Sequence, residues 1–210
     1  MLKLSKNLTE QEDFWKGQFG DDYINRNDGS KLLASKIHYF ASIFKNTVKI
    51  SSCLEFGANI GLNLDAMKTL FPYQKQFGVE INEKASSILE NKIGSKNVAN
   101  CSINNFKITQ KWDLVLLKGV LIHINPDDLK SVYKKIYQSS KKFILISEYY
   151  NPSPMAISYR GHKNKLFKRD FAGEMMDTYK NLKLNSYGFG YHRDLNFPQD
   201  DETWFLLEKE

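Results

Sequence analysis

The chain has 210 residues, of which 41% are hydrophobic and 26% are charged, and its formal net charge is +6. This length suits one domain with a sizeable core and is short for two, so we expect a single domain over residues 1–210. No apolar run approaches the roughly 18 residues that a membrane span needs, which argues against a helical membrane protein.

The start of the chain and its cysteines predict a cytoplasmic protein. Residues 1–6 lead into polar sequence without the apolar stretch of a signal peptide. Cys53 and Cys101 lie in apolar, strand-like runs without metal-ligand spacing. We therefore expect buried, reduced thiols and no bound metal.

The positive charge raises the hypothesis of a nucleic-acid partner. Only four of the 30 basic residues are arginines, the residue type that favours bidentate recognition of phosphate and guanine. Residues 160–170 hold five basic residues and one acidic residue, so most of the excess charge is local. Because the charge is not spread over a broad surface, a nucleic-acid partner is not expected.

Taken in chain order, the first expected element is a helix over 32–44, which follows an aromatic segment over 14–23. Apolar runs then predict strands, and stretches with capping residues predict helices between them. The expected strands cover 48–56, 76–81, 98–103, 112–117 and 142–147, and the expected helices cover 62–70, 83–93 and 126–140. This alternation predicts right-handed βαβ units and a doubly wound α/β sheet.

The last third of the chain is less regular. A turn over 151–154 and the basic segment 160–170 precede a helix near 171–179, and strands over 182–187 and 203–208 predict a closing hairpin. We therefore expect an N-terminal helical segment over 1–47 and a Rossmann-like core over 48–210. An insertion at about 149–180 would cover the substrate.

The most informative motif is the loop after the first strand, Glu55-Phe56-Gly57-Ala58-Asn59-Ile60-Gly61. It lacks the Gly-Lys-Ser/Thr of a nucleoside triphosphate loop and one glycine of a dinucleotide loop. Glu80 ends the second strand, where a carboxylate would accept both hydroxyls of a ribose. S-adenosylmethionine (SAM) carries a ribose and an amino-acid tail but no phosphate, so SAM fits this loop best.

Residues 54–61 resemble the first motif of the class I SAM-dependent methyltransferases, and Glu80 matches their ribose-binding acid. Blocks at 14–20, 120–124, 159–162 and 168–171 resemble a smaller group, the pseudaminic-acid-biosynthesis-associated methylases. The resemblance implies a seven-stranded sheet in the order 3-2-1-4-5-7-6, with the last strand antiparallel, and an N-terminal helical lid. The cofactor contacts that it implies are Glu55, Gly57, Ala58, Asn59, Gly61, Glu80, Ile81, Ser102, Ile103, Lys118, Gly119, Trp15, Tyr23 and Arg26.

Two positions depart from the family pattern. Asn59 stands where a glycine is commoner, which is tolerable because Asn accepts left-handed backbone conformations. Ser102 stands where an Asp is commoner, which weakens the expectation that this position bonds the adenine amine through a carboxylate.

Two histidines compete for the role of general base, because an imidazole titrates near neutral pH. His123 follows the fourth strand on the cofactor side, where a capping or packing role fits it equally well. His162 lies in the basic segment. His38, on an expected helix, is assigned a structural role.

The basic segment follows the fifth strand and so begins at the mouth of the site, where cations would bind a phosphate or carboxylate. A solvated charged face is the alternative. The loop at 191–194 joins the last two strands at the same edge of the sheet. The substrate contacts expected from these segments are Tyr159, Arg160, Lys168, Arg169, His192 and Arg193.

Together these features predict a methyltransferase that converts SAM to S-adenosylhomocysteine (SAH). The expected reaction is O-methylation of a small anionic metabolite, such as a nucleotide-activated or phosphorylated precursor of a bacterial surface polysaccharide. The alternatives are an RNA methyltransferase and a non-catalytic protein that kept the fold. We expect a monomer or homodimer with no membrane partner.

Overall fold

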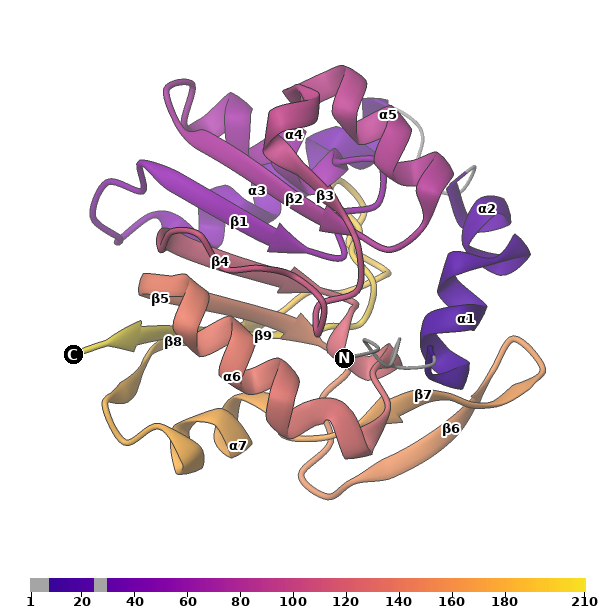
Figure 1. Ribbon diagram of the computed structural model, residues 1–210. Helices are drawn as coiled ribbons and strands as arrows, with labels where there is room; N and C mark the ends of the chain where they lie inside the picture. Colours follow the sequence, from indigo (N-terminus) through magenta and orange to yellow (C-terminus); the bar gives the residue numbers. More distant parts are fainter. Residues whose placement is uncertain (1–7, 25–29) are drawn as a thin grey trace.

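A computed structural model describes residues 8–24 and 30–210 (Figure 1). Seven strands form one sheet in the order β3-β2-β1-β4-β5-β9-β8. β9 runs antiparallel to both of its neighbours, and the other neighbouring pairs are parallel. The predicted order 3-2-1-4-5-7-6 is therefore confirmed. The strand bounds are β1 Ser52–Phe56, β2 Lys75–Glu80, β3 Val98–Asn100, β4 Trp112–Lys118, β5 Ser140–Glu148, β8 Leu182–Phe189 and β9 Thr203–Lys209.

Helices cover both faces of the sheet. One face carries α3 (Ser30–Phe44), α4 (Leu62–Leu70) and α5 (Glu83–Ile93), and the other carries α6 (Leu129–Ser139) and α7 (Phe171–Thr178) (Figure 1). Leu114 and Leu116 of β4 pack in the first layer, whereas Val115 and Leu117 pack in the second. A strand covered on both faces must be apolar on both, which explains the continuous apolar run at β4.

Glycine and asparagine residues lie at three of the four ends of the helices that follow β1 and β2. Gly61 precedes α4 at φ +83°, and the Asn82 side chain accepts a hydrogen bond from the Ala85 N–H at the start of α5. Gly94 ends α5 at φ +88°. Such residues mark helix ends in the sequence itself, and both helices begin and end where they were predicted.

Other boundaries differ from the prediction because a strand needs a partner. β1 begins at Ser52, which pairs with the first residue of β2, so residues 48–51 stay outside the sheet. β3 ends at Asn100, opposite the last residue of β2, so residues 101–103 turn away as a loop. The expected helix over 126–140 begins as a 3-10 turn, η3 (Pro126–Asp128), and Ser140 already belongs to β5. Two further 3-10 turns are η1 (Ser95–Asn97) and η2 (Leu121–His123).

The insertion after β5 contains a hairpin that the sequence analysis missed. β6 (Met155–Tyr159) and β7 (His162–Lys168) pair antiparallel outside the main sheet. They are joined by Arg160 and Gly161, at φ +50° and +86°. Two left-handed residues in succession form the tight turn whose twist suits a hairpin. The sequence signal for this hairpin is a two-residue connection that ends in glycine, and it lies within a segment rich in charged residues.

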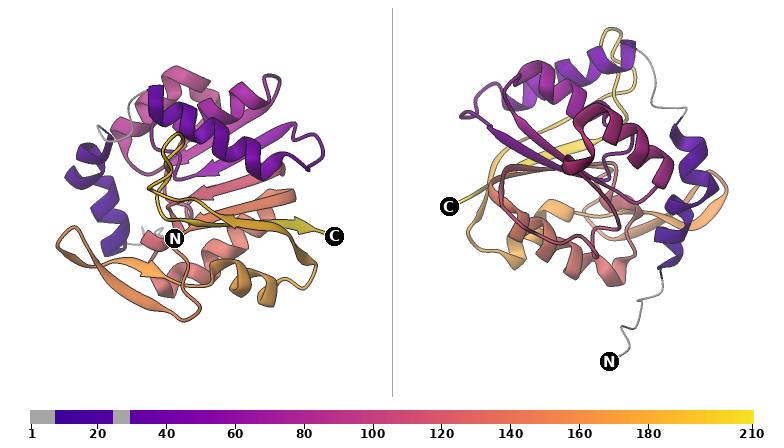
Figure 2. Two further views of the ribbon diagram at one scale, coloured as in Figure 1. Left: turned by 180° about the vertical axis from the view of Figure 1, so that it is seen from behind. Right: turned by 45° about the horizontal axis from the view of Figure 1, so that its top comes forward.

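Two short helices, α1 (Glu10–Lys16) and α2 (Gln18–Ile24), lie across the carboxyl ends of the parallel strands beside the β6–β7 hairpin (Figures 1 and 2). Thr9 begins α1 with a capping box completed by Glu12. The Asn82 side-chain amide donates to the Asp21 carboxylate at 2.8 Å, which joins α2 to the end of β2. The expected N-terminal helical lid is present. Within the described ranges, each helix is too short or too polar to cross a membrane.

Candidate functional site

The principal cavity of the described residues lies at the carboxyl ends of the parallel strands and has a volume of about 210 Å³. Loops after β1 to β5 line it from the sheet, while α1, α2 and Tyr159 of β6 line it from the outside. In open α/β sheets this is where ligands bind, next to the strands at which the order reverses, here β1 and β4.

The loop after β1 is shaped by left-handed backbone conformations. Gly57 has φ +69°, and a Cβ atom added to it would lie 2.5 Å from Cγ2 of Val120. Asn59 has φ +48°, and its own side-chain oxygen accepts a hydrogen bond from the Ile60 N–H at 2.6 Å. Asn59 therefore takes the conformation that the commoner glycine would take, and the loop keeps its shape.

Glu80 lies at the end of β2 and is buried in the cavity wall. Its carboxylate accepts hydrogen bonds from the backbone N–H groups of Asn59 at 2.7 Å and Asn82 at 2.8 Å. Burial raises the pKa of Glu80, and these hydrogen bonds oppose the rise. One bond to each oxygen fixes the carboxylate and leaves acceptor capacity on both oxygens for a pair of hydroxyl donors.

Buried polar atoms without partners mark two further walls of the cavity. Ser102 follows β3 and lines the cavity, and its Oγ has no hydrogen-bond partner among the described residues. Gln11 of α1 lines the cavity, and its Oε1 is also unpartnered there, although its Nε2 donates to the Asn164 carbonyl oxygen. Such groups cost free energy unless a ligand or water bonds them.

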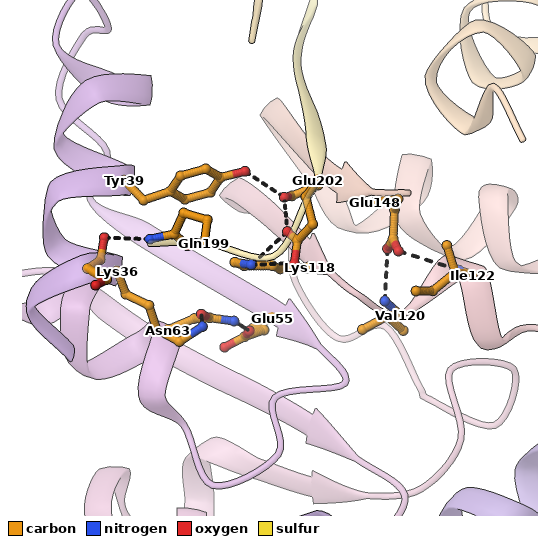
Figure 3. Close-up of polar contacts among 12 residues, drawn as sticks. Lys36, Tyr39, Glu55, Asn63, Lys118, Val120, Ile122, Glu148, Gln199 and Glu202 are labelled. Carbon is orange, nitrogen blue, oxygen red and sulfur yellow. Dashed lines mark hydrogen bonds and ion pairs between the residues drawn. The ribbon is translucent and has the colours of Figure 1, made fainter. Parts of the chain in front are cut away.

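A polar chain connects α3, α4 and β1 (Figure 3). Lys36 Nζ donates to Oδ1 of Asn63 at 2.7 Å, and Nδ2 of Asn63 donates to Oε1 of Glu55 at 2.6 Å. Oε2 of Glu55 is buried and has no partner among the described residues. Burial raises the pKa of Glu55 to about 8 and lowers the pKa of Lys36 to about 8. Lys36 and Asn63 line the cavity, whereas Glu55 lies just behind them.

Lys118, at the end of β4, forms a buried ion pair with Glu202, the residue before β9 (Figure 3). Its Nζ lies 2.6 Å from each carboxylate oxygen of Glu202, which also accepts a hydrogen bond from the Ser147 hydroxyl. Both side chains are 4% exposed. Lys118 was expected at the cofactor, and its partner Glu202, 84 residues later, was not.

Glu148 ends β5 and holds the loop after β4 (Figure 3). Its carboxylate accepts hydrogen bonds from the N–H groups of Val120 at 2.9 Å, Leu121 at 2.8 Å and Ile122 at 3.4 Å. Burial raises its pKa to about 8. An acid at the carboxyl end of an apolar strand is the signal that singled out Glu55 and Glu80, so the sequence could have revealed Glu148.

His123 lines the cavity on η2 and is 8% exposed. Its Nδ1 lies 2.6 Å from the Lys165 carbonyl oxygen. Because a carbonyl only accepts, Nδ1 carries the proton and Nε2 carries the lone pair. Burial lowers the pKa of His123 to about 4, so the ring is neutral at pH 7. The structure therefore supplies a neutral imidazole with one acceptor nitrogen.

His162 is placed differently from His123. It is exposed on β7, packs against the rings of Phe14 at 5.0 Å and Phe19 at 5.9 Å between centroids, and is absent from the cavity wall. His38 is stacked on Phe197 at 4.2 Å. Of the two histidines expected to compete for the cavity, the structure brings only His123 to it.

The expected cofactor contacts lie mostly at the cavity. Gly57, Ala58, Asn59, Glu80, Ile81, Ser102, Ile103, Lys118, Gly119, Trp15 and Tyr23 line it. Gly61 lies at the start of α4, outside the wall. Arg26 and its neighbour Asn27 fall outside the residues that the structure describes.

Of the expected substrate contacts, Tyr159 lines the cavity. The Arg160 guanidinium lies over the Tyr159 ring at 5.6 Å, and the Lys168 ammonium lies over the ring of Tyr149, a further cavity residue, at 5.4 Å. These two cations lie outside the wall, as do the other three expected contacts: Arg169 pairs with Glu174, His192 pairs with Asp201, and Arg193 is exposed. Among the described residues, no cluster of three or more His, Cys, Asp or Glu side chains could hold a metal ion.

Comparison with solved structures identifies the fold. Magnesium protoporphyrin IX methyltransferase (ChlM) from Synechocystis PCC 6803, solved with SAM, aligns with a TM-score of 0.64 and 13% identity, over 98% of this chain and 99% of that one. A SAM-dependent methyltransferase from Archaeoglobus fulgidus aligns with a TM-score of 0.64 and 15% identity, over 91% and 100%. The plantazolicin methyltransferase BpumL, in complex with SAH, aligns with a TM-score of 0.62 and 14% identity, over 95% and 94%.

The chain therefore has the Rossmann-like fold of these methyltransferases. No family model and no curated protein matches its sequence.

Proposed function

We propose that the protein is a SAM-dependent methyltransferase. The observation that carries the proposal is the buried carboxylate of Glu80, which two backbone N–H groups fix in the wall of the cavity. It has the acceptor capacity that the two hydroxyls of a ribose need. Solved proteins of this fold that contain SAM or SAH support the choice of nucleoside.

The remaining donors and acceptors of this half of the cavity fit the other parts of the cofactor. The unpartnered Ser102 hydroxyl is suited to the adenine. Lys36 offers a cation to the carboxylate of the amino-acid tail, and Glu55, bridged to Lys36 by Asn63, offers its unpartnered Oε2 as an acceptor to the ammonium. The left-handed turn at Gly57 lets the backbone come close to that tail, because a Cβ there would meet Val120.

The chemistry requires an electrophile, a positioned nucleophile and a proton acceptor. When bound, SAM supplies a methyl carbon to which an oxygen or nitrogen of the acceptor bonds, while the carbon–sulfur bond breaks and its electron pair stays on sulfur, giving SAH. His123 can accept a hydrogen bond from the acceptor at Nε2, because Nδ1 is committed to the Lys165 carbonyl, and with a pKa of about 4 it is a weak base for that proton. The helices α1 and α2 line the outer side of the cavity, where they would exclude water and orient the reactants.

The finer part of the proposal concerns the methyl acceptor. The acceptor is a small anionic metabolite that is methylated on oxygen. It is a precursor of a bacterial surface polysaccharide, and the reaction takes place in the cytoplasm. Its support is the sequence blocks that resemble the pseudaminic-acid-associated methylases, together with Arg160 and Lys168 beside the tyrosines of the cavity. If the protein binds immobilised RNA at physiological salt, the alternative of an RNA methyltransferase would be favoured. If the protein binds SAM but transfers its methyl group to no candidate metabolite, the alternative of a non-catalytic protein would be favoured.

Isothermal titration with SAM and SAH tests the proposal. Glu80→Gln keeps the size of the side chain but removes its charge and one acceptor oxygen, so we expect SAH affinity to fall roughly 30-fold, about 2 kcal/mol. Glu83→Gln alters an exposed acid nearby and should bind as the wild type does. Absence of binding to the wild-type protein, or an unchanged affinity of Glu80→Gln, would refute the proposal.

A further inference from the structure

Gln11 carries a buried hydrogen-bond acceptor that no described residue uses. The residue lies on α1, is 5% exposed and lines the cavity. Its Nε2 donates to the Asn164 carbonyl oxygen at 3.0 Å, and its Oε1 has no partner among the described residues. Because a carbonyl only accepts, the nitrogen of the amide must face Asn164. The amide is therefore fixed, with its oxygen turned away from Asn164.

Two contacts place Gln11 beside η2, the turn after β4. Trp15 lies one turn later on the same face of α1, and its ring centroid is 4.6 Å from that of His123, the last residue of η2. Asn164, which accepts from Gln11, belongs to β7, and β7 is bonded to η2 through the Lys165 carbonyl. Gln11 therefore lies at the part of the cavity that η2 lines.

The loop after β3 supplies a second wall on the same side of the sheet. Ser102, Ile103 and Asn104 follow β3 and line the cavity. Oδ1 of Asn104 accepts a hydrogen bond from the Ser131 hydroxyl of α6, which joins this loop to the helix that follows η2. Ile103 and Ile122 of η2 belong to the same buried apolar cluster. The loop after β3 and η2 thus form a largely apolar wall on which the Ser102 hydroxyl, 7% exposed, is unpartnered among the described residues.

The hydrogen-bond donors of the cofactor identify a partner for Oε1 of Gln11. SAM has three kinds of N–H or O–H donor, which are the ribose hydroxyls, the ammonium of the tail and the adenine amine. In the proposed binding mode Glu80 accepts from the hydroxyls and Glu55 accepts from the ammonium. The adenine amine is the donor that remains. A flat base with polar atoms on its edge also suits an apolar wall that carries few polar groups.

The other side-chain acceptors near this wall are engaged or reach solvent. Oδ1 of Asn104 is bonded as described, and Oδ1 of Asn125 accepts a hydrogen bond from the Asp127 N–H. Asp128 also lines the cavity, but it is partly exposed, so water can solvate its carboxylate. Among these acceptors, Oε1 of Gln11 is the one whose burial costs free energy unless a donor reaches it.

We infer that Gln11 of the lid recognises the adenine of SAM: its Oε1 accepts a hydrogen bond from the adenine amine, and the Ser102 hydroxyl donates to a ring nitrogen of the same base. The two groups together select a 6-aminopurine, because one accepts from the amine and the other donates to the ring. The inference rests on the proposed function for the identity of the cofactor. It gives the lid a direct part in the choice of nucleobase.

Calorimetric titration of the wild-type protein with SAH and two analogues tests the inference. In the first analogue hydrogen replaces the adenine amine, which leaves Oε1 of Gln11 without its donor. We expect SAH to bind about tenfold tighter than this analogue. In the second analogue a 6-oxo group replaces the amine and places an acceptor opposite Oε1, so it should bind more weakly still. Equal binding of SAH and the first analogue overturns the inference.

Variants assign the preference to Gln11, and each is judged by the ratio of the two affinities, so that a general loosening of the lid cancels. Gln11→Met has a similar length but no acceptor and should bind SAH and the first analogue within about twofold of each other. Gln11→Glu keeps an acceptor oxygen and should keep the preference for SAH. Gln18→Met changes an exposed glutamine of α2 outside the cavity wall and should behave as the wild type does.

Three results would contradict the role of Gln11. They are a tenfold preference that persists in Gln11→Met, a preference that is lost in Gln11→Glu, and a preference that is lost in Asp128→Ala, which would assign the amine to Asp128 instead. If Gln11→Met binds neither ligand, the results for Gln11→Glu and Asp128→Ala decide.

The same titrations distinguish this inference from the proposed function. If SAH binds and its affinity depends on Glu80, but the wild type does not prefer SAH to the first analogue, the role of Gln11 falls and the proposed function stands. If the wild type binds no SAH, the proposed function itself falls.

Discussion

The two halves of the cavity are built in different ways. In the half formed by β1, β2 and β3, the chain within residues 55–103 supplies most of the wall, and backbone N–H groups orient Glu80. In the half formed by β4 and β5, the wall combines Trp15, His123, Tyr159 and Glu202, which come from far-apart parts of the chain. A site made from one continuous segment leaves a motif in the sequence, whereas a site made from distant side chains does not.

The largest expected effect follows from breaking a long-range pair of the β4–β5 half. Lys118→Met leaves Glu202 buried without its cation, so the free energy of unfolding should fall by about 3 kcal/mol or more in urea denaturation. Lys84→Met breaks a pair in which the lysine is 68% exposed and screened by solvent, so it should cost much less. Equal losses in the two variants would show that the buried pair does not hold this half together.

Two glycines with similar backbone conformations test the loop of the other half. Gly57 and Gly119 have φ +69° and +67°, so alanine at either position costs about 1 kcal/mol of backbone strain. Only at Gly57 does the added Cβ meet another side chain, Val120; at Gly119 nothing lies within 4 Å. We expect Gly57→Ala to lose about 2 kcal/mol of unfolding free energy and most SAH affinity, and Gly119→Ala to lose about half that stability.

If the two glycine variants have the same stability and the same SAH affinity, contact between a Cβ atom at position 57 and Val120 is not the reason that this position requires glycine. Urea denaturation and calorimetric titration of both variants under one set of conditions make the comparison.

The smallest expected effect concerns the pH dependence of His123. Its pKa is lowered to about 4 in the folded protein from an ordinary value near 6.5, so the unfolded chain binds this proton first as the pH falls. The stability that His123 contributes is complete above pH 6.5 and is lost as the pH falls from there through 4. Between pH 7 and pH 6, the wild type should lose about 0.7 kcal/mol more than His123→Gln.

Nitrogen NMR of the His123 ring measures the same property directly. We expect the proton on Nδ1 and no protonation of Nε2 at pH 6. A titration near 6.5, or a proton on Nε2, would contradict the bond to the Lys165 carbonyl.

Much of the fold follows from local signals in the sequence. The helices 62–70 and 83–93 were predicted correctly, because a glycine loop and Pro72 bound the first and Asn82 and Gly94 bound the second. The strand order was predicted through the family resemblance and is confirmed. The strand over 48–56 was drawn too long, because hydrophobicity shows which residues could pair and not where the partner strand begins.

The residues of the candidate site likewise fall into those that local sequence signals predict and those that they do not. Glu80, Gly57 and Asn59, which line the cavity, could be singled out from the sequence because they belong to a short strand, a tight turn and the end of the next strand. Lys36 and Glu202 were missed because a lysine on a helix and an acid in a loop look like solvated surface residues. His162 was expected to compete with His123, and only the packing of β7 against α1 and α2 places it outside the cavity.

The sequence by itself determined the sheet, its two layers of helices and the loop after β1, since each depends on hydrophobic periodicity or on backbone conformations that few residues accept. The tertiary structure alone decided which histidine and which lysines line the cavity, and which acids are buried. Those properties depend on desolvation and on contacts between residues far apart in the chain. No short pattern of residues encodes these properties, because desolvation and long-range contacts depend on which segments the fold brings together.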